Sequence, residues 1–144
     1  MTSPLRPDAR PLNPASKARL VAEVLAAYVR VRWSLARNDV SSTVAALRAS
    51  RPHATREATG FDDQLVGQRL GHAVRRTLTP LPSDSRCLVS SLTLTTLLAR
   101  RGIRTSLVIG VRSAPTFEAH AWVEHHGVPL TPAGGDAFQR LMEL

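Results

Sequence analysis

The second half of the chain constrains the fold most, because one helical pattern and three strand patterns follow one another there with turn residues between them. Residues 87–102, CLVSSLTLTTLLARRG, place leucines at helical spacing and end on a glycine, which favours a helix with a glycine C-cap. Residues 105–111, TSLVIGV, predict a strand that is buried on both faces. Residues 118–126 and 128–131 predict two more strands joined by the hairpin turn His126-Gly127.

The first eighty residues carry helical patterns and no convincing strand. Residues 16–36 have the apolar spacing of an amphipathic helix, and a shorter helix is expected after it with Ser41 or Ser42 as its cap. A third helix is expected from Phe61, capped by one of the two aspartates that follow it and ended by a Thr-Pro-Leu-Pro run.

This order of elements predicts an α+β fold in a single domain. We expect a disordered, proline-rich arm at 1–14, a helical half at 15–82, and a unit at 83–144. The last unit would begin with a Ser-Asp-Ser cap at 83–85, continue as the helix, and end in a small antiparallel sheet. The tail after the sheet, AGGDAFQRLMEL, is expected to form a loop with no more than one helical turn.

Length and hydropathy limit the classes of protein to which the chain can belong. A chain of 144 residues with 43% hydrophobic residues is long enough for one buried core. No apolar run approaches the ~20 residues of a membrane-spanning helix, and we expect no contact with a membrane. The polar N-terminal stretch lacks the apolar core of a signal peptide, which favours a cytoplasmic protein.

The charge is strongly basic at +8, and every basic residue except Lys17 is arginine. Such a composition is typical of biased codon usage, or else it indicates an acidic partner. The arginines are dispersed along the chain, and aromatic residues make up only 4%, so no stacking platform for nucleic-acid bases is present. We therefore expect no nucleic-acid partner.

Cys87 is the only cysteine, which excludes an internal disulfide and a cysteine zinc cluster. It falls in the first turn of the predicted helix, where unpaired backbone N–H groups favour a thiolate and can stabilise an oxyanion. Arg86 adjoins it and adds positive charge. Cys87 is thus a candidate nucleophile, although a lone cysteine is more often a small buried hydrophobe.

His120 is the candidate base. It lies in the strand Glu-Ala-His-Ala-Trp-Val-Glu, where the flanking alanines leave room for another segment to approach. Strand alternation places His120 on one face with Trp122 and Glu124 and leaves the other face for the core. His125 and His126 fall at the predicted hairpin tip and are expected to be solvated. A zinc site on them would need distant carboxylates, so neither a metal nor another cofactor is expected.

The stretch from Arg86 to Leu130 resembles the leader peptidase of lasso-peptide biosynthesis, a branch of the transglutaminase-like superfamily. The helix beginning Arg-Cys-Leu, the buried strand, the Glu-Ala-His-Ala-Trp block and the hairpin occur in the family's order. The resemblance implies a transglutaminase-like (papain-like) domain in which Cys87 is the nucleophile and His120 the base.

It also implies a function: cysteine-peptidase removal of the leader from a ribosomally made precursor peptide, in the stand-alone form of the enzyme. That form depends on a separate leader-recognition protein, and a macrolactam cyclase acts on the same peptide. Two alternatives use the same residues. The chain could be a catalytically weak peptide-binding or scaffold module, or an acyltransferase or deamidase.

The chain departs from the family at the third catalytic residue. The family usually has an aspartate about a dozen residues after the histidine, and this chain has Thr131-Pro132 there. A two-residue turn at 126–127 would place residue 120 opposite 133. Asp136 could fold back through two glycines, Thr131 or a backbone carbonyl could orient the ring, or the pair could work as a dyad.

Three residues are candidates for substrate binding: Arg86, Trp122 and Glu124. Trp122 would cover the cleft or else pack in the core. Glu124 lies four residues along the strand from His120, about 13 Å away, and would bind substrate or anchor the hairpin. Gly110, inside the buried strand, indicates a bulge or a close backbone approach. Arg112 is expected to pair with Glu118 or Glu124, or to be solvated.

Overall fold

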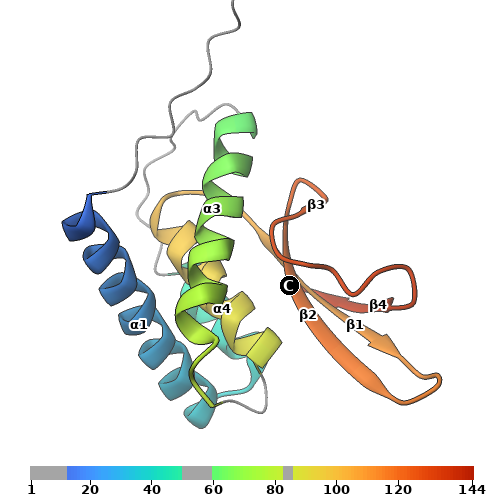
Figure 1. Ribbon diagram of the computed structural model, residues 1–144. Coiled ribbons are helices and arrows are strands. Elements are labelled where there is room, and N and C mark those ends of the chain that lie inside the picture. Colours follow the sequence, from blue (N-terminus) through green and yellow to red (C-terminus); the bar gives the residue numbers. More distant parts are fainter. Residues whose placement is uncertain (1–12, 50–59, 83–85) are drawn as a thin grey trace, which may run out of the picture.

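A computed structural model describes residues 13–49, 60–82 and 86–144. Within these ranges, helices form one layer and a four-stranded antiparallel sheet forms the other (Figure 1). No helix in the described part of the chain is long and apolar enough to cross a membrane. The elements are α1 (Pro14–Arg37), α2 (Val40–Ala49), α3 (Gly60–Leu78), α4 (Arg86–Arg100), β1 (Ser106–Arg112), β2 (Glu118–His125), β3 (Val128–Pro129) and β4 (Gln139–Glu143).

The α+β order predicted from the sequence is confirmed, and the helix starts are refined. Helix α1 begins two residues earlier than predicted, because Pro14 fits the first helical position and Asn13 Oδ1 accepts from the Ala15 N–H at 3.4 Å. Helix α3 begins at Gly60, so the two aspartates lie in its first turn. The predicted arm at 1–14 lies outside the described residues except for its last two, and so does the predicted cap at 83–85.

Helix α2 is capped by Asp39 and not by Ser41 or Ser42, which corrects the sequence prediction. The Asp39 carboxylate accepts from the Ser42 hydroxyl, the larger effect, and from backbone N–H groups, and together these hold the pKa of Asp39 below its ordinary value. Asp39 also accepts from the Thr43 N–H through its backbone carbonyl. The serines were misassigned because Asp39, Ser41 and Ser42 are all good N-caps within four positions, and only the backbone geometry selects among them.

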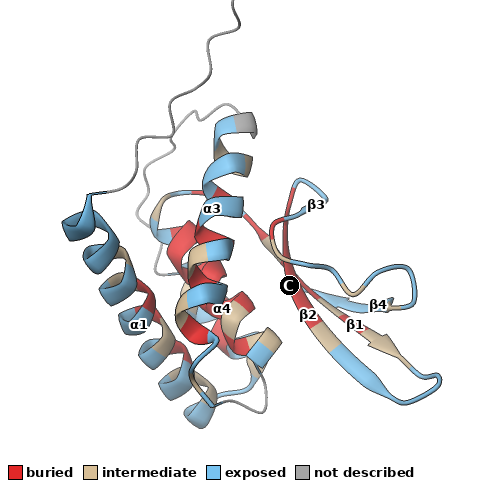
Figure 2. Cartoon of the chain, viewed as in Figure 1, coloured by how far each residue is buried: buried red, intermediate tan, exposed pale blue. Residues whose placement is uncertain are grey.

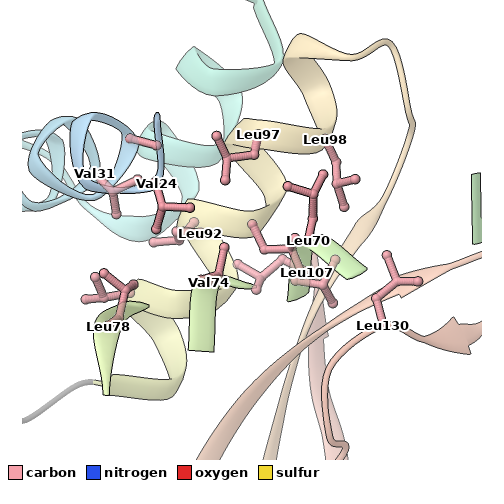
Figure 3. Close-up of a cluster of buried hydrophobic side chains, with 14 of the residues drawn as sticks. Val24, Val31, Leu70, Val74, Leu78, Leu92, Leu97, Leu98, Leu107 and Leu130 are labelled. Carbon is pink, nitrogen blue, oxygen red and sulfur yellow. The ribbon is translucent and has the colours of Figure 1, made fainter. Parts of the chain in front are cut away.

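Helix α4 is the centre of the molecule, and every residue from Ser91 to Ala99 is buried (Figure 2). Helices α1 and α3 pack on one side of it and β2 on the other. It ends where predicted: Gly102 has φ 76°, and Ile103 N–H and Gly102 N–H donate to the carbonyls of Leu98 and Ala99 in a Schellman motif. Figure 3 shows the core around it, with Val24 and Val31 from α1 and Leu70 and Val74 from α3 beside Leu92, Leu97 and Leu98.

The sheet has the order β3-β2-β1-β4, with every pair antiparallel. Glu124 lies opposite Pro129 and His125 opposite Val128, which confirms the register predicted from a two-residue turn. His126 and Gly127 have φ of 49° and 76°, the left-handed conformation that such a hairpin turn requires.

Two predictions about this half of the chain are wrong. The tail was expected to be a loop, yet residues 139–143 form strand β4 along the free edge of β1. All five are exposed, so no burial pattern marked the strand in advance. His125 was expected to be solvated at the hairpin tip, but it is 4% exposed and its Nδ1 hydrogen-bonds the Arg104 carbonyl at 2.8 Å.

Gly110 allows the indole of Trp122 to lie directly on β1. A Cβ at position 110 would lie 2.8 Å from Cζ3 and Cη2 of that ring. The pairing of β1 with β4 also shifts register between Ile109 and Gly110. The close approach predicted from the glycine is therefore confirmed, whereas the residue left without a partner at the register shift is Leu141 of β4 and not a residue of β1. Within β1 only Leu107, Val108 and Gly110 are buried, so the predicted burial on both faces does not extend along the whole strand.

We predict that Gly110→Ala lowers the free energy of unfolding by about 1–3 kcal/mol, because the added methyl group forces the indole out of its position. Urea unfolding measures the loss. In the background of Trp122→Phe, which lacks the outer ring atoms, the same substitution should cost much less. An equal cost in both backgrounds would contradict this account of the glycine.

Candidate active site

Cys87 and His120 line one pocket, with a volume of about 340 Å³. Its walls come from the end of α3, the first turns of α4, strand β2 and the segment after β3. Residues that lie 33 positions apart in the chain thus meet at one cavity, because α4 packs against β2. The sequence analysis predicted Cys87 as the nucleophile and His120 as the base, and the fold places both of them at this pocket.

Cys87 is the second residue of α4 and is half-buried against the core. One turn further along the same helix face, Ser91 is 2% exposed and its Oγ donates to the backbone carbonyl of Ala121 at 3.1 Å. Since Ala121 directly follows His120, this hydrogen bond ties the helix face that carries the thiol to the strand that carries the imidazole.

The ring of His120 is held by three neighbours. Its Nε2 lies 2.8 Å from the backbone carbonyl of Pro132, and a carbonyl can only accept, so Nε2 carries the hydrogen. In the neutral ring, Nδ1 is then the nitrogen with a free lone pair. The ring also stacks on Trp122, with centroids 6.0 Å apart, and tilts against Phe138 at 5.7 Å.

The position expected for a third catalytic residue is occupied by main chain. The Thr131 hydroxyl lines the pocket but accepts from the Val123 N–H at 3.0 Å, which makes it part of the hairpin. Asp136 is exposed and does not line the pocket. Of the alternatives left open by the sequence, the contact present in the structure is a backbone carbonyl, that of Pro132.

Of the three candidates for substrate binding, only Arg86 lines the pocket. Trp122 and Glu124 are each 4% exposed, and the Trp122 Nε1–H donates to Glu124 Oε1 at 2.8 Å. Arg140 from β4 donates to the same oxygen at 2.6 Å, so Glu124 links its own strand β2 to β4 and does not line the pocket. Arg112 pairs with Glu118, which is one of the two partners predicted for it.

The sequence analysis missed four other pocket residues, namely Arg75, Thr79, Ser90 and Ser91. Ser91 could have been found, because it lies four residues after Cys87 and therefore on the same helix face. Arg75 and Thr79 could not, because they reach the pocket only through the packing of α3 on α4.

An α+β domain with a thiol in the first turn of a buried helix and an oriented histidine on the adjoining strand is a common arrangement in cysteine enzymes that act by acyl transfer. Residues 9–143 match the family model of the transglutaminase-like superfamily. The chain belongs to that superfamily. No curated protein and no solved structure gives a significant match. A Cys-His peptidase or acyltransferase activity is compatible with this membership.

We predict that Ser91→Ala lowers the free energy of unfolding by about 1 kcal/mol, because the Ala121 carbonyl loses a buried donor. It should also change the rate at which iodoacetamide alkylates Cys87, since the contact between α4 and β2 is loosened. Ser90→Ala is the matched control, for Ser90 lines the same pocket and makes no hydrogen bond through its side chain among the described residues. Equal effects of the two substitutions on stability and alkylation would contradict the role given to Ser91.

Proposed function

We propose that this protein is a cysteine peptidase that removes the leader from a ribosomally made lasso precursor peptide. The observation that carries the proposal is the shared pocket of Cys87 and His120, in which the histidine ring is already oriented. Membership in the transglutaminase-like superfamily supports the chemistry. The order of motifs from Arg86 to Leu130 supports the narrower substrate class.

In the proposed reaction the Cys87 thiol gives its proton to Nδ1 of His120, and the thiolate attacks the carbonyl carbon at the junction of leader and core. The oxyanion of the tetrahedral intermediate lies near the free N–H groups of the first turn of α4. His120 returns the proton to the leaving amine, which frees the core. Water then attacks the thioester carbonyl, with His120 again as the base, and releases the leader as a carboxylic acid.

In this proposal the Pro132 carbonyl orients the imidazole of His120, as a carboxylate does in a catalytic triad. It fixes the tautomer by accepting from Nε2, so that Nδ1 is left for the thiol proton. A carbonyl carries a dipole and no net charge, and it therefore stabilises the imidazolium less than a carboxylate would. The pair would work as a Cys-His dyad with a main-chain orienter.

The proposal extends to location and partners. The enzyme would act in the cytoplasm on the precursor peptide, which a separate leader-recognition protein presents to it, and the macrolactam cyclase would take up the freed core. Two other functions are compatible with the same pocket. An acyltransferase would pass the acyl group to an amine and a deamidase would hydrolyse a side-chain amide, whereas a peptide-binding module without catalysis would form no acyl group.

We predict that Cys87→Ala abolishes cleavage of the precursor, because no thioester can form without the sulfur. Mass spectrometry of the products measures the loss, and circular dichroism checks that the fold is kept. Cleavage at the normal rate by this variant would exclude the peptidase. Transfer of the leader to an added amine in preference to water would indicate an acyltransferase. Precursor left intact by wild-type enzyme together with the leader-recognition protein would indicate a binding module.

We predict that Asp136→Ala cleaves at close to the wild-type rate, since Asp136 is exposed and lies outside the pocket. Thr131→Ala should slow the reaction, because the loss of the bond to Val123 N–H loosens the segment that carries the Pro132 carbonyl. Single-turnover kinetics with saturating enzyme compares the two. A fall of about a hundredfold or more in Asp136→Ala would instead make that carboxylate the orienter.

A further inference from the structure

The pocket of Cys87 and His120 is basic, as far as the described residues line it. Two arginines line it, Arg75 from α3 and Arg86 from the start of α4, and no aspartate or glutamate does so among residues 13–49, 60–82 and 86–144. Neither arginine pairs with a carboxylate among the described residues; Arg86 makes only a long 3.5 Å contact to the Leu81 carbonyl. The two guanidinium groups are therefore available to a ligand.

Arginines without a carboxylate partner are common in the described part of the chain, and what distinguishes Arg75 and Arg86 is that both line the cavity that holds Cys87. Elsewhere in the described part of the chain, three arginines each have a carboxylate partner: Arg101 with Glu23, Arg112 with Glu118, and Arg140 with Glu124. A guanidinium group offers paired N–H donors that match the two oxygens of a carboxylate. Two such groups at one partly enclosed cavity produce a positive potential that attracts an anionic segment.

We propose that Arg75 and Arg86 form a carboxylate-binding subsite beside Cys87, and that the preferred substrate is a peptide with an aspartate or glutamate close to the bond that is attacked. This inference rests on the proposed peptidase function and names the chemistry that the peptide must carry. The carboxylate belongs to an acidic side chain or to the end of a peptide chain, and the experiments below separate these sources.

Arg76 supplies a matched control. It is the next residue of α3, is also exposed, and has no carboxylate partner among the described residues. Its side chain lines a different groove, between α1 and α3, and not the pocket of Cys87. Arg75→Gln and Arg76→Gln thus remove the same charge from adjacent positions, and only the first removes it from the proposed subsite.

The single cysteine makes a test possible that needs no substrate. Iodoacetate and iodoacetamide both alkylate the thiolate through their CH₂ carbon with loss of iodide. They differ in that iodoacetate is an anion and iodoacetamide is neutral. The ratio of their rates at Cys87 therefore reports the local attraction for a carboxylate, with the reactivity of the sulfur cancelled. We expect Arg75→Gln to lower this ratio about threefold and to weaken its dependence on salt, and Arg76→Gln to leave both nearly unchanged.

Equal ratios in wild type, Arg75→Gln and Arg76→Gln would overturn the subsite. A folded protein in which neither reagent modifies Cys87, although the urea-unfolded chain reacts, would overturn it as well, because the pocket would then be closed to carboxylates. Arg75→Glu extends the series, and it should lower the ratio below that of Arg75→Gln.

The substrate arm uses precursor peptides in which acidic residues near the cleaved bond are changed one at a time to their amides. We expect one such change to lower kcat/KM about tenfold with wild-type enzyme and to have little further effect with Arg75→Gln.

Blocking the peptide's C-terminus as an amide should change nothing. A loss of activity on that change, absent in Arg75→Gln, would assign the subsite to a chain end and overturn the side-chain preference. If no peptide is cut while the alkylation ratio depends on Arg75, the subsite holds and the peptidase function fails.

Discussion

The structure depends on the burial of α4 between two layers. Helices α1 and α3 cover one side of α4 and strand β2 the other, so nearly all of its length is removed from water. Its first turn and its last residue, Arg100, reach the surface, and Cys87 lies in that first turn. The packing that stabilises the domain therefore also fixes where the thiol lies relative to the sheet, and a shift of α4 along β2 would separate Cys87 from His120. The hydrogen bond from Ser91 to the Ala121 carbonyl lies in this contact and opposes such a shift.

The other face of β2 is packed as firmly, for a different reason. Trp122 lies on the bare backbone of Gly110 and donates to Glu124, which in turn binds Arg140 of the edge strand. This arrangement supports the ring of His120 from the side, since its imidazole stacks on the indole. In the strand Glu-Ala-His-Ala-Trp-Val-Glu, the histidine therefore lies at the pocket, and Trp122 and Glu124 lie behind it.

Local patterns of sequence predicted what local geometry determines. The turn at His126-Gly127 fixed the hairpin register, and Gly102 marked the end of α4, because positive φ and the two-residue turn leave few alternatives. Strand β4 was missed because its residues are all exposed and its only partner is the open edge of β1. The orienting carbonyl of Pro132 was no more than one option among several, since a main-chain group has no signature in the sequence.

The missing carboxylate at the orienting position and the two arginines without a carboxylate partner both affect the charge balance of the pocket. When His120 takes up a proton, the new positive charge meets a carbonyl dipole on one side and the guanidinium groups of Arg75 and Arg86 around the same pocket. The Cys87 thiolate formed in the same step offsets that charge, and no carboxylate is among the described residues that line the pocket. A peptide carboxylate bound at the arginines would add a further negative charge, and it would do so only when substrate is present. In that arrangement the substrate offsets the charge of the two arginines, and a neutral main-chain group is sufficient to orient the ring.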